Sequence, residues 1–311
     1  MKYIRNVDTY ESPAATALTL GKFDGVHRGH RKLIAEIHRL AREEEWQTAV
    51  FTFDVAPQIV MGARPQQMLM TNPERAEIMR ELNVDQLIEC PFTEKLKSMT
   101  AEDFVRDIIV GKLHAKAVVV GTDFHFGKNR SGSPEFLAQI AGKYGFRVLV
   151  IEKEKDGSRD ISSTYIREEL AGGRIEKVTE LLGYPYFVTG QIVHGRQLGR
   201  TLGFPTINQI PDPAKMLPPH GVYFSRTLVG GRLYQGITNI GVKPTVDGSR
   251  LGLETYLFDC SLDLYDQQAR VELLHYRRSE VKFSSVEELK NQVDRDIEAA
   301  DLYFQPEHGT S

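Results

Sequence analysis

A change in hydrophobic period near residue 182 constrains the fold of this chain most. Before it, short β-branched runs alternate with amphipathic helical patterns. The expected strands are 17–20, 48–53, 86–89, 117–120 and 147–151. Alternation of this kind predicts a parallel sheet with helices on both faces, as in Rossmann-like α/β domains.

Three helix starts in this first part carry capping signals. Residues 71–74, Thr-Asn-Pro-Glu, combine capping-box spacing with a proline in the first turn. Residues 100–103 repeat the spacing, and 133–134 pair a serine N-cap with proline at the first helical position. Helices are therefore predicted to begin at all three places.

After Gly183 the apolar runs are short, β-rich and separated by glycine or asparagine turns. Without long helices between them, parallel crossovers are disfavoured and a small antiparallel β-barrel is predicted. A closing helix is expected to begin near Ser284, which has capping-box spacing to Glu287, and to continue to about Phe304. The expected strands are 186–193, 222–228, 233–240, 253–258 and 269–275, with a tight hairpin at 229–232.

A chain of 311 residues exceeds what one hydrophobic core usually supports, so two domains are expected, 1–183 and 184–311. The net charge of -3 favours neither a nucleic-acid nor a membrane partner. Cys90 and Cys260 fit no metal-ligand spacing, which indicates ordinary half-buried thiols in a reducing cytoplasm. No secretion signal or membrane helix is predicted. The oligomeric state stays open between monomer and weak self-association.

A glycine-rich turn at 20–31 leaves the first strand and enters a helix. His27 and His30 lie three apart in its first turn and share one face. Free backbone N–H groups and the helix dipole attract phosphate there, two imidazole donors would add to this, and Gly29 would allow close approach. The alternative is that these are surface histidines at an ordinary helix start. The position of the motif in a glycine-rich turn directly after a strand argues against it.

Two further segments extend this candidate site. Residues 161–167, ISSTYIR, begin a helix with hydroxyl side chains, and Arg167 adds a guanidinium fork suited to phosphate. A plain Ser/Thr N-cap is the alternative. Residues 120–127 follow an apolar strand and present Asp123 among aromatic side chains. Those aromatics could equally cover the core.

A second candidate site lies in the β-rich part, at 195–208. Its glycines recur at every fourth position, but Pro205 and the glycine density disfavour a helix. A flexible phosphate-covering loop is predicted instead. After it, Thr206 can ligate Mg²⁺ through its hydroxyl, and Asn208 can contribute either a carbonyl oxygen or a phosphate contact. The chain has no GxxxxGK[ST] segment, so the site would lack a P-loop lysine.

Together these motifs resemble the prokaryotic bifunctional riboflavin kinase/FMN adenylyltransferase family. HxGH at 27–30, GxDFxFG at 121–127 and ISSTxIR at 161–167 are similar to its nucleotidylyltransferase module. GxxLGxPTxN at 199–208 is similar to its riboflavin kinase module, in which Glu254 matches a base on a later strand. The resemblance implies an α/β nucleotidylyltransferase domain, then a small antiparallel β-barrel kinase domain with a C-terminal helix. It implies ATP, riboflavin and FMN as substrates, with Mg²⁺.

The resemblance also assigns roles to residues of this chain. The implied catalytic residues are Glu254, His27, His30 and Arg167, the histidines and Arg167 positioning and neutralising phosphates. The implied metal ligands are Thr206 and Asn208. The implied nucleotide- and flavin-binding residues are Gly21, Phe23, Asp24, Gly25, Gly29, Asp123, Ser163, Thr164, Gly195, Gly199, Gly203, Pro205, Thr206 and Asn208.

Three departures and three alternatives accompany this interpretation. The family usually has asparagine at Lys22, arginine at Lys243 and a first loop proline at Val55, and these differences bear on flavin seating. One alternative is an enzyme with a single activity, in which one of the two modules binds flavin without catalysing a reaction. The others are a non-enzymatic flavin-sensing regulator and a nucleotidylyltransferase for a pantetheine or lipid-headgroup substrate.

Overall fold

The computed structural model describes residues 1–62, 66–195, 199, 202–245 and 248–305. The chain divides into two compact units, Met1–Ser163 and Thr164–Ser311. This division places α7 (Ser163–Ala171) almost wholly, and α8 (Ile175–Leu182) entirely, with the second unit. The expected domain boundary near residue 183 stays a prediction.

The first unit is built on a six-stranded parallel sheet of order β1-β4-β3-β2-β5-β6. All five expected strands are confirmed, within two residues at each end; β1 was not expected, because three residues carry too little pattern. The strands are β1 (Lys2–Ile4), β2 (Thr16–Leu20), β3 (Gln47–Phe53), β4 (Gln86–Cys90), β5 (Ala115–Gly121) and β6 (Arg147–Ile151).

The strand order reverses direction between β2 and β5. The chain leaves β2 toward β3 on one side and leaves β5 toward β6 on the other. In open α/β sheets the crevice at such a point, beyond the carboxyl ends of the strands, is where ligands bind. The topology thus brings the segments after β2 and β5, which carry two of the predicted motifs, to one place.

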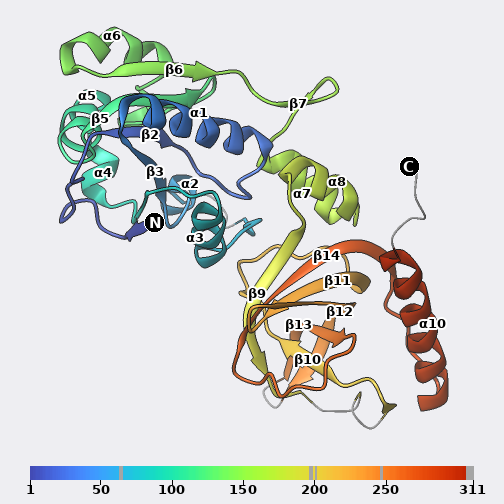
Figure 1. Cartoon of the computed structure of the whole chain (residues 1–311). Coiled ribbons are helices and arrows are strands. Elements are labelled where there is room, and N and C mark those ends of the chain that lie inside the picture. Colours follow the sequence, from blue (N-terminus) through green and yellow to red (C-terminus); the bar gives the residue numbers. More distant parts are fainter. Residues whose placement is uncertain (63–65, 196–198, 200–201, 246–247, 306–311) are drawn as a thin grey trace. The chain divides into compact units, whose positions relative to one another are not determined.

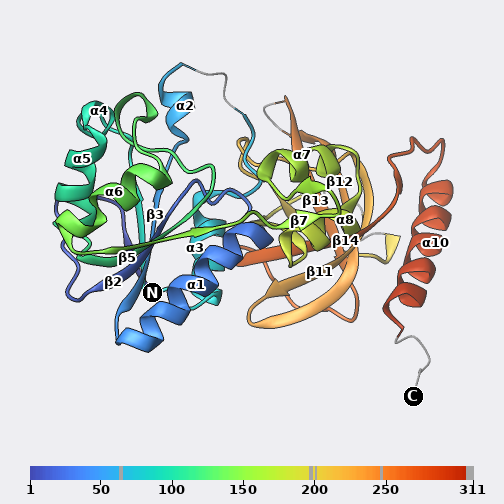
Figure 2. The same cartoon turned by 90° about the horizontal axis from the view of Figure 1, so that it is seen from above.

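Helices cover both faces of this sheet, as Figures 1 and 2 show. The long helix α1 packs on β2, β3 and β5, and α1 and α3 lie on the opposite side of the sheet from α4, α5 and α6. The helices are α1 (Arg28–Glu44), α2 (Pro57–Val60), α3 (Asn72–Glu81), α4 (Glu94–Ser98), α5 (Ala101–Asp103), the π-helical η1 (Phe104–Val110), the 3-10 turn η2 (Lys128–Arg130) and α6 (Pro134–Tyr144). A two-stranded hairpin of β7 (Lys155–Asp156) and β8 (Arg159–Asp160) follows β6.

The capping predictions are confirmed in the first unit. Thr71 and Glu74 form both bonds of a capping box, Thr71 N donating to Glu74 Oε2 at 2.9 Å. Thr100 Oγ1 accepts from the backbone of Asp103 at 3.1 Å, and Ser133 Oγ also accepts at its helix start. These caps need only residues three apart, which explains why the sequence predicts them well.

The second unit contains a closed antiparallel barrel of order β10-β13-β12-β11-β14-β9, as predicted. Its 230–231 turn has φ values of 57° and 77°, the left-handed conformation that two-residue hairpin turns require. Helix α10 (Val286–Phe304) packs Ala300 against the barrel wall. The strands are β9 (Tyr186–Val193), β10 (Thr206–Gln209), β11 (Gly221–Val229), β12 (Arg232–Thr245), β13 (Gly248–Leu257) and β14 (Gln268–Ser279).

Several expectations for this part need correction. Gly199 and Leu202 have helical backbone, where a non-helical loop was predicted, and β10 joins the barrel although no strand was expected there. The closing helix begins near Ser284, as predicted, but the capping residue is Ser285 rather than Ser284: Ser285 Oγ accepts from Glu288 N at 3.1 Å.

Both cysteine thiols are free, but only one is half-buried. Cys90 is fully buried at the end of β4, whereas Cys260 has intermediate exposure. Within the described residues, no helix has the length and apolarity needed to cross a membrane.

Two candidate active sites

The first site is the glycine-rich loop between β2 and α1, which the chain holds in an uncommon conformation. Gly25 has φ of +84°, and the non-glycine residues Phe23 and Val26 also lie in the left-handed region, at +48° and +35°. Both of these side chains are fully buried. Non-glycine residues keep such angles only where the surroundings over-determine them, a feature concentrated at functional sites.

His27 and His30 face one another at the start of α1. Their rings stack with centroids 3.7 Å apart, and the Phe23 ring lies 5.0 Å from that of His30. The Nδ1 atoms of both histidines are closed to solvent and have no hydrogen-bond partner among the described residues. Buried polar atoms without partners mark a place that a ligand or water completes.

Burial makes both imidazoles neutral at physiological pH. It lowers the pKa of His27 to about 4, an effect that the charge of Asp123 partly opposes. The pKa of His30 is held well below its ordinary value by burial, then by His27 and by the charge of Arg75. Both rings can hydrogen-bond phosphate oxygens but add no positive charge in this state, so burial does not favour the expected neutralising role.

Ser163 joins the second motif to this loop. Its Oγ donates to the backbone carbonyl of Asp24 at 2.8 Å, and an Asp24 carboxylate oxygen accepts from Met70 N at 3.2 Å. The ISST segment and the HxGH loop are therefore in direct contact although 139 positions separate the bonded residues. Thr164 and Arg167 follow on α7, in the second unit, and their approach to this loop stays a prediction.

In the segment after β5, the aromatic residues and Asp123 occupy different surroundings. The rings of Phe124 and Phe126 stack 5.5 Å apart and pack against the core cluster, as the core-covering interpretation predicts. The Asp123 side chain is 70% exposed and pairs with Lys153 Nζ at 3.0 Å, a hydrogen bond that raises the pKa of Lys153. Asp123 thus lies on the solvent side of this segment, while the aromatic side chains cover the core.

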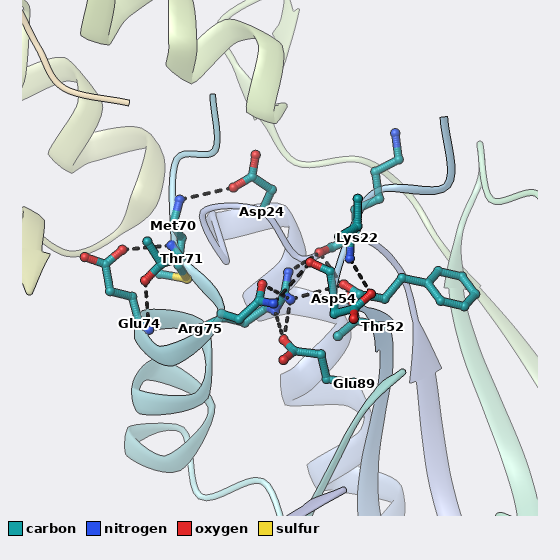
Figure 3. A network of polar contacts seen from close by, with 12 residues as sticks. Lys22, Asp24, Thr52, Asp54, Met70, Thr71, Glu74, Arg75 and Glu89 are labelled. Atoms are coloured by element: carbon teal, nitrogen blue, oxygen red, sulfur yellow. Dashed lines mark hydrogen bonds and ion pairs between the residues drawn. The ribbon is translucent and has the colours of Figure 1, made fainter. Parts of the chain in front are cut away.

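Sequence reasoning missed a buried ion pair beneath this loop. Arg75 on α3 is 4% exposed and Glu89 on β4 is 3% exposed, and the two side chains form an ion pair (Figure 3). A signal was present: Glu89 is the only charged residue in the otherwise buried strand β4. A charge in such a strand requires a buried partner, but the sequence does not say which.

The departures at Lys22 and Val55 lie at the borders of this site. The Lys22 side chain is exposed and leads away from the polar network in Figure 3, while its carbonyl accepts from Thr52 Oγ1 at 3.2 Å. Val55 is exposed and follows β3. The side chain of Lys243 falls outside the described part of the chain.

The second site lies on neighbouring strands of the barrel. Thr206 Oγ1 on β10 donates to Glu254 Oε1 on β13 at 3.1 Å, and Asn208 is the Cα partner of Glu254 in the same strand pair. All three are partly buried. The pairing of strands 48 residues apart thus brings the predicted base and the predicted metal ligands together.

Glycines in the preceding loop allow close packing against these residues. A Cβ added to Gly195 would lie 2.4 Å from the Asn208 amide nitrogen, so any larger residue would displace that side chain. Gly199 O accepts from Phe204 N at 2.9 Å, and Gly203 has φ of +94°. Residues 196–198 and 200–201 of the predicted loop lie outside the described residues.

A hollow of about 460 Å³ adjoins this second site. The residues that line it are Pro205, Tyr256, Leu257, Asp259, Cys260 and Ser261. A second hollow, of about 300 Å³, lies in the first unit at the amino-terminal edge of its sheet, beside Trp46 and Arg147 at the starts of β3 and β6. It contains none of the predicted motifs.

The oxygen atoms of the second site suit a hard cation. Thr206 offers a hydroxyl, Asn208 an amide and Glu254 a carboxylate, the donor types that Mg²⁺ accepts. The described residues include no cluster of three or more histidine, cysteine, aspartate or glutamate side chains suited to a metal.

Comparison with known proteins assigns the class of each unit. A model of the FAD synthetase family matches residues 9–165, and a model of the riboflavin kinase family matches residues 182–304. The fold, the two sites and these matches define a two-domain flavin-nucleotide transferase.

Full-length relatives identify the family. The bifunctional riboflavin kinase/FMN adenylyltransferase of Escherichia coli K12 is 35% identical, over 98% of each chain. Its namesake from Haemophilus influenzae is 36% identical, over 93% of this chain and 94% of the relative. The chain belongs to the bifunctional riboflavin kinase/FMN adenylyltransferase family, as its motifs predict.

One solved structure shares the fold over nearly the whole length. It is named a macrolide-efflux protein from Streptococcus pneumoniae, and it matches with a TM-score of 0.86 at 29% identity, covering 96% of this chain and 98% of that chain. Its name describes an activity different from those of the two matched families.

Proposed function

We propose that the chain carries out both reactions of its family in succession. The barrel phosphorylates riboflavin to FMN with ATP, and the α/β domain adenylylates FMN to FAD with release of pyrophosphate. The observation that supports this best is that each matched domain holds its own assembled site. Ser163 contacts Asp24 in one, and Thr206 contacts Glu254 in the other.

In the kinase reaction Glu254 is the general base. Its carboxylate accepts the proton of the ribityl 5′-hydroxyl as that oxygen attacks the γ-phosphorus of ATP and ADP leaves. The bond from Thr206 orients the Glu254 carboxylate. Thr206 and Asn208 would hold Mg²⁺, which supplies neutralisation of the phosphate charge when bound.

In the adenylylation reaction the FMN phosphate is itself the nucleophile and needs no strong base. It attacks the α-phosphorus of a second ATP, and pyrophosphate leaves. His27 and His30 position phosphate oxygens at the start of α1, whose dipole favours the anion, and Ser163 holds the second motif beside them through its bond to the Asp24 carbonyl. Because burial keeps the histidines neutral, we assign the added positive charge to Arg167.

A chromatographic time course of flavins tests this function. The purified protein is mixed with riboflavin, excess ATP and Mg²⁺, and a parallel tube receives FMN in place of riboflavin. We expect FMN to appear first and FAD to follow, and FAD to form directly in the second tube. Unchanged flavin in both tubes contradicts the proposal, and omission of Mg²⁺ should abolish both reactions.

We also propose a cytoplasmic enzyme with small-molecule substrates only and no nucleic-acid partner. Family membership and the net charge of -3 support this. We expect light scattering to show a monomer or a weakly concentration-dependent association. A stable higher oligomer at micromolar concentration contradicts that expectation.

A further inference from the structure

The guanidinium of Arg75 contacts the ends of three neighbouring parallel strands. Nε donates to Glu89 Oε1 on β4 at 3.0 Å, and Nη2 bonds the same carboxylate oxygen. Nη1 donates to the carbonyl of Lys22, just after β2, at 3.2 Å, and Nη2 donates to the carbonyl of Phe53, which ends β3, at 3.1 Å. Figure 3 shows Arg75 between Glu89 and these strand ends.

Neighbouring side chains complete the network. The second carboxylate oxygen of Glu89 accepts from the Tyr3 hydroxyl on β1, so both oxygens have partners. Asn72, one turn before Arg75 on α3, accepts from Arg75 Nη2 at 2.8 Å and donates to the carbonyl of Asp54 at 3.1 Å. The start of α3 therefore holds the chain immediately after β2 and immediately after β3.

Stability alone is a poor explanation for this arrangement. Withdrawing two charges from water is costly, and well-packed apolar residues of similar size often serve a core equally well. What apolar residues cannot do is bond backbone carbonyls and thereby fix where a loop begins. The planar guanidinium does so in several directions at once.

The two held segments border the predicted adenylylation site. The Lys22 carbonyl lies two residues before Asp24, whose own carbonyl receives Ser163 Oγ at 2.8 Å. Phe53 leads into the loop that contains Val55. Both carbonyls lie at the carboxyl edge of the sheet, beside the point where the strand order reverses.

We propose that Arg75, held by Glu89, is a positioning residue for adenylyl transfer: it sets the loops after β2 and β3 in the geometry the reaction needs, without touching substrate. The inference rests on the adenylylation proposed above. Displacement of a site by about 1 Å can cost roughly 100-fold in rate. Loss of the guanidinium should therefore lower kcat for FAD formation by about 10- to 100-fold.

The test compares a single and a double variant of the full-length protein. Arg75→Met removes the fork and leaves Glu89 buried without its ion pair. Arg75→Met with Glu89→Gln removes both charges, and the amide keeps an acceptor for Tyr3. Melting temperature and the kcat and KM for FAD formation are measured for each, with riboflavin phosphorylation as an internal standard that both variants should leave unchanged.

We expect the double variant to regain melting temperature relative to the single one while kcat for FAD formation stays low. Recovery of both quantities together would overturn the inference, because the pair would then act through stability alone. Wild-type kcat in Arg75→Met would overturn it equally. Arg75→Lys, which keeps charge but not the planar fork, should recover only part of the rate.

Thr48→Val is the matched control for destabilisation. Thr48 is buried at the opposite end of β3, where its Oγ1 bonds Asp85 Oδ2 at 2.8 Å. The nearly isosteric valine should lower the melting temperature by about 2–4 °C without reaching Arg75. If the double variant stays unstable, its rate of FAD formation is compared with that of Thr48→Val at equal fractions folded. If Arg75→Met fails to fold, Arg75→Lys takes its place in the same comparison. A rate no lower than the control refutes the inference.

Failure of the underlying function gives a different result. A wild-type protein that forms no FAD from FMN contradicts the proposed adenylylation itself. Wild-type FAD formation with the double variant at wild-type kcat contradicts only the positioning role.

Discussion

Replacement of Glu254 by glutamine should separate the two activities of the chain. Glutamine keeps the size of the side chain and an oxygen for Thr206, whose Oγ1 lies 3.1 Å from Glu254 Oε1, but it cannot accept a proton. General-base catalysis contributes about 100- to 10,000-fold in rate. We therefore expect riboflavin phosphorylation to fall at least about 100-fold, equivalent to about 2.7 kcal/mol of transition-state stabilisation.

The assay follows both products by chromatography under saturating ATP and Mg²⁺. FAD formation from supplied FMN should stay within about twofold of wild type in Glu254→Gln, since that reaction uses the other domain. His27→Ala should show the reciprocal pattern, with FAD formation lost and FMN formation kept. Glu287→Gln, an exposed glutamate on α10, is the control that changes net charge by the same amount.

Two results would refute this reasoning. If Glu254→Gln phosphorylates riboflavin within about threefold of wild type, the carboxylate is not the base. If a folded Glu254→Gln protein loses both reactions, the two-site model is wrong. Thr206→Ser keeps the hydroxyl, so a large loss there would show that orientation by Thr206 depends on more than the bond to Glu254.

The remaining predictions concern stability and reactivity. The pKa of His27 is about 4 in the folded protein and 6.5 in the unfolded chain, so between these values the unfolded chain binds the extra proton. The free energy of unfolding should therefore fall by on the order of 3 kcal/mol as the pH drops from 6.5 to 4. The same pH dependence of that free energy in wild type and His27→Gln would contradict this. Burial raises the pKa of Cys90 to about 11, so a thiol reagent at pH 8 should label Cys260 alone in native protein; rapid labelling of both would contradict the burial. Asp296 is buried and accepts from Arg278 Nη2 at 2.6 Å, so Asp296→Ala should lower the free energy of unfolding in urea by about 3–5 kcal/mol. A decrease below about 1 kcal/mol would show that this ion pair contributes little to stability.

The elements that sequence alone predicts are those whose signals are local. Thr71 and Glu74 form their capping box because the partners are three residues apart, and the β-branched runs become strands in the expected places. The motifs at 27–30, 161–167 and 199–208 likewise locate both candidate sites. Short strands such as β1 and β10 escape prediction because their conformation comes from pairing with distant strands.

Other properties exist only once the chain is folded. Pairing across 48 residues brings Thr206 to Glu254, and the start of α3 meets β4 to form the Arg75 and Glu89 ion pair. The sequence predicts that His27 contacts phosphate, but the charge state of the ring depends on how much water the finished fold excludes from it. Residue types and their spacing thus determined the family, the two reactions and the candidate groups. Burial and long-range packing decided which of those groups meet and which carry charge, because desolvation is a property of the assembled structure.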